Sequence, residues 1–232
     1  MSNNPRTSLG TTALVALVTA FAPPTALAQT GHDPAHSPYR DLRASHQITF
    51  TGGYLAGGGG EAGAGPKQGP LAGLRYSLSL SGSLEMTVGV HGANLDRRLV
   101  DTTAAPDSGS LGIARQSVII ADAGFTLRIT GPKTWHGWMP YVGASLGLAT
   151  GSTVTQDSSG FAFGNPFQFG PRLGLRRYGA GPVSLWIEAW DPIWRLRYPG
   201  SWQSGATPRV SVGREWVHHP TLLVGLSFIL RT

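Results

Sequence analysis

The feature that most constrains this chain is a two-residue alternation on both sides of a Gly- and Pro-rich turn. From Phe167 to Arg176, apolar residues occupy the odd positions, while Gln, Gly or Arg occupies the even ones. The stretch from Val183 to Trp190 repeats the alternation. If the two arms fold about Ala180, Arg172 faces Glu188. The pattern predicts a β-hairpin with one apolar face and one face of paired charge among glycines.

The same alternation recurs along the chain and predicts eight strands. The connections between them alternate long, short, long, short, long, short and long, which is typical of outer-membrane barrels with short periplasmic turns and long outer loops. Each strand has ~8–11 residues in its membrane part, enough to cross a bilayer when tilted. The sequence therefore predicts an all-β fold, an eight-stranded antiparallel up-and-down transmembrane β-barrel. The predicted strands are 47–56, 71–80, 84–91, 113–130, 140–149, 167–176, 183–190 and 221–231.

Composition favours this fold over a soluble barrel. Charged residues make up 13% of the chain, whereas a soluble globular domain has about 25%. A lipocalin-like barrel also has eight strands, but in water this chain would expose a belt of Leu, Val and Phe, which is an aggregation hazard. The absence of Cys excludes disulfides and thiolate chemistry.

The N-terminal segment predicts export. A mostly apolar run ends in Ala26-Leu27-Ala28, which fits a secretory cleavage site. A membrane anchor is disfavoured because the run is short and interrupted by Pro23 and Pro24. We therefore predict a cleaved signal peptide over residues 1–28, a flexible periplasmic lead-in over 29–46, and an outer-membrane barrel domain over 47–232. The predicted location is the bacterial outer membrane.

Several short segments resemble a known family. The tetrapeptide at 134–137 (Thr-Trp-His-Gly) precedes Pro-Tyr-Val-Gly-Ala at 140–144, and Glu-Trp at 215–216 leads toward the last strand. The chain resembles the small bacterial outer-membrane β-barrels of the OmpA/OmpX type, over about residues 47–232. In the last strand, Gly225, Phe228 and Leu230 match the family's insertion signal. The resemblance implies recognition by the barrel-assembly machinery through this strand. The chain ends in Thr rather than in the family's usual aromatic residue.

Seven charged residues are predicted to face the barrel interior. The lumen of an eight-stranded barrel is about filled by side chains, so such charges must pair or be solvated. We expect them to form a polar plug, with Arg172 paired to Glu188. The alternative is a gated pore or a binding site. The predicted network comprises Arg75, Glu85, Asp122, Arg128, Arg172, Arg176 and Glu188.

Two further sets of residues are assigned to the membrane interface. Arginines among aromatic residues in the last long loop suit contact with phosphate, so outer-membrane lipid and lipopolysaccharide are the expected partners. These residues are Arg195, Arg197, Arg209 and Arg214. Aromatic side chains near the strand ends are interpreted as two interfacial girdles. The predicted girdles contain Trp135, Trp138, Tyr141 and Tyr178 at the short turns, and Tyr54, Phe167, Trp190, Trp194 and Trp216 at the long loops.

The sequence shows no recognisable catalytic or metal-binding motif. The histidines do not occur with a carboxylate at ligand spacing, and His91 or His219 could join a catalytic triad only if the fold brought a Ser and an acid to them. We therefore expect a non-enzymatic protein with no catalytic residues, metal or cofactor, no nucleic-acid partner and a monomeric state. The expected role is envelope-structural or surface interaction through the long outer loops. The alternatives are a narrow, porin-like channel or transporter for small or hydrophobic solutes, and a lipid A-modifying enzyme.

Overall fold

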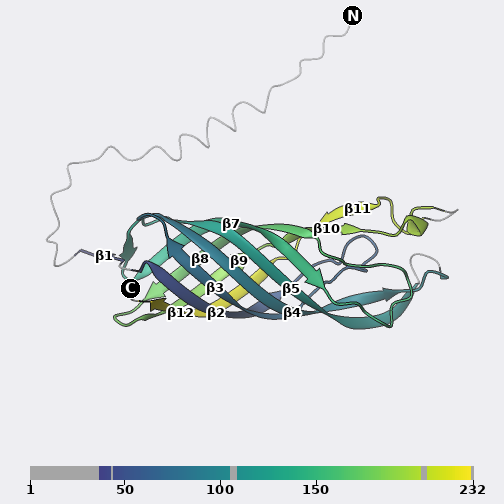
Figure 1. The fold of residues 1–232 in the computed structure, drawn as a ribbon, viewed down its shortest axis with the longest axis horizontal. Coiled ribbons are helices and arrows are strands. Elements are labelled where there is room, and N and C mark those ends of the chain that lie inside the picture. The colour runs from purple at the N-terminus through teal and green to yellow at the C-terminus, as the bar shows by residue number, and fades with distance from the viewer. Residues whose placement is uncertain (1–36, 43, 105–108, 205–207, 231–232) are drawn as a thin grey trace, which may run out of the picture. The chain divides into compact units, whose positions relative to one another are not determined.

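Eight long antiparallel strands close into a barrel in the computed structural model, which describes residues 37–42, 44–104, 109–204 and 208–230 (Figure 1). Neighbouring barrel strands pair in chain order, and the last pairs with the first, which closes the wall. The predicted fold class is thereby confirmed. The barrel strands are β2 (His46–Leu55), β3 (Gly69–Ser79), β4 (Leu84–Val100), β5 (Ser110–Arg128), β7 (Trp138–Gly151), β8 (Phe167–Tyr178), β9 (Val183–Trp190) and β12 (Thr221–Leu230).

Shorter elements lie at the two ends of the barrel. β1 (Tyr39–Asp41) pairs with β6 (Lys133–Trp135). The predicted lead-in therefore contains a paired strand, which corrects the expectation that all of it is flexible, while the predicted signal peptide lies outside the described residues. At the opposite end, β10 (Ile193–Arg197) pairs with β11 (Arg214–Val217) (Figure 1). A single helical turn at Gly200–Trp202 lies between these two strands in the sequence. Among the described residues, no helix has the length and hydropathy needed to span a membrane.

The hairpin register predicted from the sequence is wrong by two residues. Arg172 lies opposite Trp190, and Glu188 lies opposite Gly174. Folding about Ala180 would have placed Pro182 in the ladder, but proline has no backbone N–H to donate. The turn is instead centred one residue later, and the carbonyl of Pro182 accepts a hydrogen bond from the backbone N–H of Ile229 on β12. A shift of two residues leaves every side chain on its predicted face.

Two predicted loops contain additional strand structure. The polar loop expected over 94–112 is largely the continuation of β4 and β5, whose ladder extends to the pair Val100 and Ser110. In the loop expected over 191–220, β10 and β11 continue the register of β9 and β12, because Trp194 pairs with Val217 just beyond the pair Trp190 and Thr221. The gap between these pairs contains prolines, which have no backbone N–H to donate to a ladder. Their presence accounts for the interruption of the two strands.

Alternating burial separates an apolar exterior from a two-zone interior. Outward side chains in the central part of the barrel strands are mostly apolar, and many are about half exposed. The interior near the long loops is mainly apolar but also contains buried Arg97, Gln116, Gln168 and His219, whereas the interior toward the short turns is mainly polar and charged. We call these the apolar zone and the charged zone. The apolar zone is built mainly from Leu55, Leu71, Leu95, Val118, Ile120, Ala149, Trp190, Trp194, Leu196 and Leu223.

Candidate functional site: the charged zone and the loop cap

Glu188 on β9 is the centre of one half of the charged zone. Arg75 on β3 donates from Nη1 to Oε2 at 2.9 Å and from Nη2 to Oε1 at 3.0 Å. Tyr141 on β7 donates its hydroxyl to Oε2 at 2.8 Å, and the indole N–H of Trp186 donates to that hydroxyl. The guanidinium of Arg75 also lies 4.8 Å from the centre of the Trp186 ring. All four side chains are buried, so the carboxylate is held by strands from three sides of the barrel.

Arg172 joins this group from β8, but its main partner is not the predicted one. Its Nη2 donates to Oδ1 of Asp122 on β5, whereas its Nε lies 3.9 Å from Oε1 of Glu188. Arg172 and Glu188 are therefore in contact, but each makes its hydrogen bonds with another residue. His91 adds a further contact, since its Nε2 lies 3.8 Å from Oδ2 of Asp122. The predicted pair is thus one weak link within a larger set.

Glu85 on β4 organises the other half of the charged zone. Arg176 donates from Nη1 to Oε2 at 2.9 Å and from Nη2 to Oε1 at 2.7 Å. Arg128 donates from Nη2 to Oε2 at 2.9 Å and also reaches Ser79. One carboxylate thus serves two arginines. The structure places all seven predicted charged side chains in the interior and distributes them over two clusters, four arginines against three carboxylates in total.

Aromatic side chains close the long-loop end of the barrel. Trp194 stacks on His219 with ring centroids 3.8 Å apart, and Phe163 meets Trp194 edge-on at 5.5 Å. Farther out, the rings of Phe161 and Tyr198 lie 5.9 Å apart, and Trp202 stacks on both. Burial lowers the pKa of His219 to about 4, so the ring is neutral at pH 7. These rings and the apolar zone beneath them form an aromatic and aliphatic closure, here called the loop cap.

Four of the nine residues assigned to the aromatic girdles face inward, so the prediction that they lie at the membrane interface is wrong. Their positions alternate with lipid-facing residues, so their parity places them on the interior side. These four are Tyr141, Tyr178, Trp190 and Trp194. The other five lie on the outer surface with 38–50% of their area exposed: Trp135, Trp138, Tyr54, Phe167 and Trp216.

The four loop arginines do not form one surface. Arg195, Arg197 and Arg214 are exposed on the outward face of the β10–β11 hairpin, where Arg197 pairs directly opposite Arg214. The guanidinium of Arg195 lies 5.8 Å from the centre of the Trp216 ring. Arg209 instead donates from Nη2 to the carbonyl oxygens of residues 101 and 104, at 2.7 Å each, and is half-buried. It connects two loops rather than facing lipid.

No catalytic triad is assembled around the candidate histidines in the described part of the chain. His91 contacts Thr51 and Asp122, and both ring nitrogens of His219 face backbone carbonyls. In residues 37–42, 44–104, 109–204 and 208–230, no three His, Asp or Glu side chains gather as a metal site. His218 and Asp191 form a pair that no local sequence pattern predicts, with Nδ1 and Oδ2 2.7 Å apart at the barrel rim. Only the interrupted ladder brings these residues together.

Comparison with known proteins finds likenesses among solved structures but no sequence relative. No protein-family model matches the chain, and no curated protein matches its sequence. OprG of Pseudomonas aeruginosa has a TM-score of 0.49 at 11% identity, covering 82% of this chain and 98% of that one. Neisserial surface protein A has a TM-score of 0.48 at 14% identity, covering 84% and 98%. The N-terminal barrel domain of P. aeruginosa OprF has a TM-score of 0.43 at 13% identity, covering 80% and 100%. All three are outer-membrane proteins. These likenesses concern the fold alone.

Proposed function

We propose that this protein is an integral outer-membrane barrel with a closed lumen, and that it acts through the surface of its long loops. The observation that carries the proposal is the filled interior. Ion-paired side chains occupy the charged zone, and fully buried Leu, Ile and Trp side chains occupy the apolar zone above it. An eight-stranded barrel is just wide enough for side chains to fill. An ion crossing it would have to displace salt-bridged arginines and then pass the buried side chains of the apolar zone, which favours a structural or contact role over transport.

Bonds between the long loops support a contact role. Glu61 accepts two hydrogen bonds from the backbone N–H of Ser211, at 2.9 and 3.0 Å, while Glu215 accepts one from the backbone N–H of Glu61 at 2.6 Å. Arg97 on the outer part of β4 forms an ion pair with Asp157, which links a second pair of segments. A surface held in this way is preorganised, and preorganisation lowers the entropic cost of binding a partner.

The closed lumen is tested by conductance in a planar bilayer. Refolded wild-type protein is compared with Glu188→Ala, with a general porin as the positive control and a heat-modifiability gel to verify folding. We expect both proteins to be silent, because Glu188→Ala leaves the apolar zone intact. Steady channels in the wild type would overturn the closed lumen and favour the narrow channel. Channels in Glu188→Ala alone would show that the charged zone, rather than the apolar zone, closes the barrel.

We also propose that β12 carries the assembly signal and that the protein is a monomer. Phe228 and Leu230 face outward on the last strand, which pairs with β9 on one side and β2 on the other. Phe228→Ala together with Leu230→Ala is expected to reduce the amount of folded barrel in the outer membrane, while refolding into detergent in vitro is retained. An equal loss in both settings would assign these residues to stability instead.

A further inference from the structure

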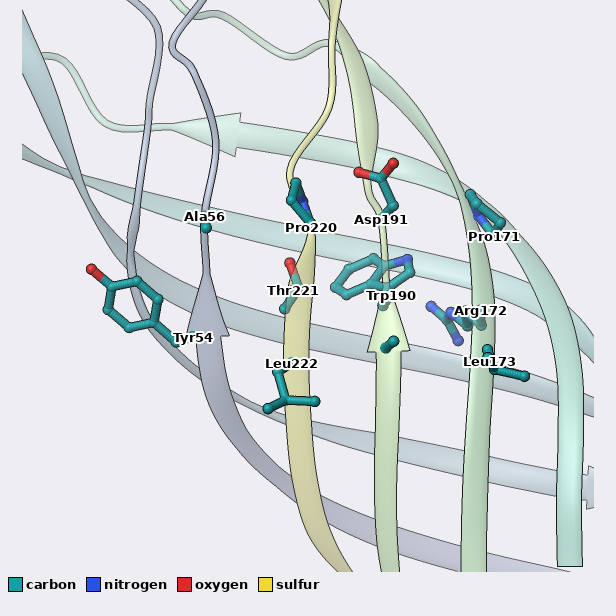
Figure 2. Close-up of a pocket in the computed structure, with 11 residues that line it drawn as sticks. Tyr54, Ala56, Pro171, Arg172, Leu173, Trp190, Asp191, Pro220, Thr221 and Leu222 are labelled. Atoms are coloured by element: carbon teal, nitrogen blue, oxygen red, sulfur yellow. The ribbon is translucent and has the colours of Figure 1, made fainter.

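A shallow groove lies on the lipid-facing outer wall of the barrel. It measures about 600 Å³ and is largely open on its outer side. Figure 2 shows Tyr54 and Leu222 on one side of it, Leu173 and Pro171 on the other, and the Trp190 indole between them. The groove lies where β9 ends and the small or short side chains Ala56, Ala189 and Pro220 replace larger ones. We call it the outer-wall groove.

The floor of the outer-wall groove contains polar donors with no hydrogen-bond acceptor in the protein. Arg172 and Trp190 are among the residues that line the groove, although both side chains are almost wholly buried. Nε and Nη1 of Arg172 and Nε1 of Trp190 are buried and donate no hydrogen bond to the protein, although Nε of Arg172 lies 3.9 Å from Oε1 of Glu188. A buried donor without an acceptor costs free energy. A ligand that brings an acceptor oxygen to this point, such as the carbonyl of an acyl ester, is therefore favoured over a plain hydrocarbon.

An uncompensated cationic surface lies directly beyond the groove on the same two strands. β10 and β11 continue β9 and β12 in register, so outward residues form one column from Leu222 to Arg214. In the described part of the chain, no carboxylate lies within ion-pair distance of Arg195, Arg197 or Arg214, which we call the arginine triplet. The rise of about 3.4 Å per residue puts Arg195 about 14 Å beyond Asp191 at the rim of the groove, within reach of a lipid headgroup.

Trp216 marks the height of the membrane interface on this column. Its ring is half exposed, meets Phe169 edge-on at 5.6 Å, and lies beneath the guanidinium of Arg195. Trp is enriched at the headgroup level of membrane proteins. With Trp216 at the headgroup level, the arginine triplet would lie at the headgroups and the outer-wall groove below it among the acyl chains.

We infer that the outer-wall groove and the arginine triplet form one binding site for a phosphorylated, multiply acylated lipid of the outer leaflet, the chemistry of lipopolysaccharide. One acyl chain occupies the groove, its ester or amide carbonyl meets the donors at the floor, and a phosphate is bound by the triplet. Arginine suits this task because its planar guanidinium pairs with phosphate oxygens in a bidentate manner. The inference relies on the proposed membrane location, but not on the closed lumen.

The test measures binding of bisphosphorylated lipid A, and of the same lipid with both phosphates removed, to the full chain in detergent by native mass spectrometry. Ala189→Phe fills the groove. Its matched control is Ala123→Phe, which lines a second lipid-facing groove of about 550 Å³. Arg195→Ala combined with Arg214→Ala removes charge from the triplet, and Arg115→Ala removes an exposed arginine elsewhere. Heat-modifiability gels verify that each variant is folded.

We expect Ala189→Phe to weaken binding of both lipids about tenfold or more, because the acyl chain loses its buried surface. The double Arg variant should weaken binding of the phosphorylated lipid at least about fivefold and leave the dephosphorylated one unchanged. The two controls should match the wild type. Equal effects of Ala189→Phe and Ala123→Phe, or no preference for phosphate in the wild type, would overturn the site. A dimer abolished by Ala189→Phe would overturn it too and assign the groove to a second copy. None of these outcomes bears on conductance.

Discussion

Arg75 and Glu188 are 113 positions apart in the sequence, yet they form a two-point ion pair across the barrel interior, with N–O distances of 2.9 and 3.0 Å. Arg75 belongs to β3 and Glu188 to β9, which are not neighbours in the sheet. Side chains of both residues are at most 2% exposed. The pair therefore joins two walls of the barrel through its centre, and its geometry depends on the closure of the whole sheet.

Glu188→Ala is expected to destabilise the barrel by about 3–5 kcal/mol, because it leaves the buried charge of Arg75 without its counter-ion. The double variant with Arg75→Leu and Glu188→Leu should recover most of that loss, since both charges are then gone while Arg172 keeps Asp122. Urea unfolding in lipid vesicles measures the difference. If the double variant is as unstable as Glu188→Ala, the cost lies in lost packing or in Tyr141 rather than in the unpaired charge.

Removing Glu85 should cost more than removing Arg128. Glu85→Ala leaves two buried arginines, Arg128 and Arg176, without their carboxylate, and we expect a loss of about 3–5 kcal/mol. Arg128→Ala leaves the two-point pair of Arg176 with Glu85 in place, so a smaller loss is expected. The same unfolding assay ranks the two variants. The reverse order would mean that Arg128 acts mainly through Ser79 and the turn that follows β3.

The sequence predicts which face each residue occupies, but not its partner. The two-residue period is local, so the inward positions of Arg75 and Glu188 follow from their own strands. Their contact depends on strands far apart in the sequence and on the stagger of the closed barrel, which no local pattern reports. The register error at Pro182 shows the same limit within a single hairpin. Similarly, the parity of Tyr141 indicates the interior, whereas assigning aromatic residues to girdles by their position near a strand end ignores parity.

Packing in the charged zone depends on a glycine beside an aromatic ring. Gly174 on β8 lies opposite Tyr141 in the sheet, and a Cβ atom at this position would meet the Tyr141 ring. Gly174→Ala should therefore displace the ring, weaken its bond to Glu188, and destabilise the barrel by about 1–3 kcal/mol. Gly92→Ala is the matched control, because nothing lies within 4 Å of the added Cβ, and it should be within about 0.5 kcal/mol of the wild type. Equal stability of the two variants would show that the Tyr141 ring can move aside without a measurable loss of stability.

The loop cap should lose stability in mild acid through His219. Burial lowers the pKa of His219 to about 4, below its value of about 6.5 in an unfolded chain. Between these values the unfolded state binds more protons than the folded state. Stability is therefore complete above about pH 6.5, falls as pH decreases toward 4, and then levels off, with a total loss of at most about 3 kcal/mol.

His219→Phe keeps an aromatic ring against Trp194 but cannot titrate, so its stability should lack this component between pH 7.5 and 5. His218→Ala, which removes an exposed histidine one residue away, controls for general effects of acid. Urea midpoints followed by tryptophan fluorescence at the two pH values measure the difference, and parallel curves for the wild type and His219→Phe would show that His219 is not the titrating group.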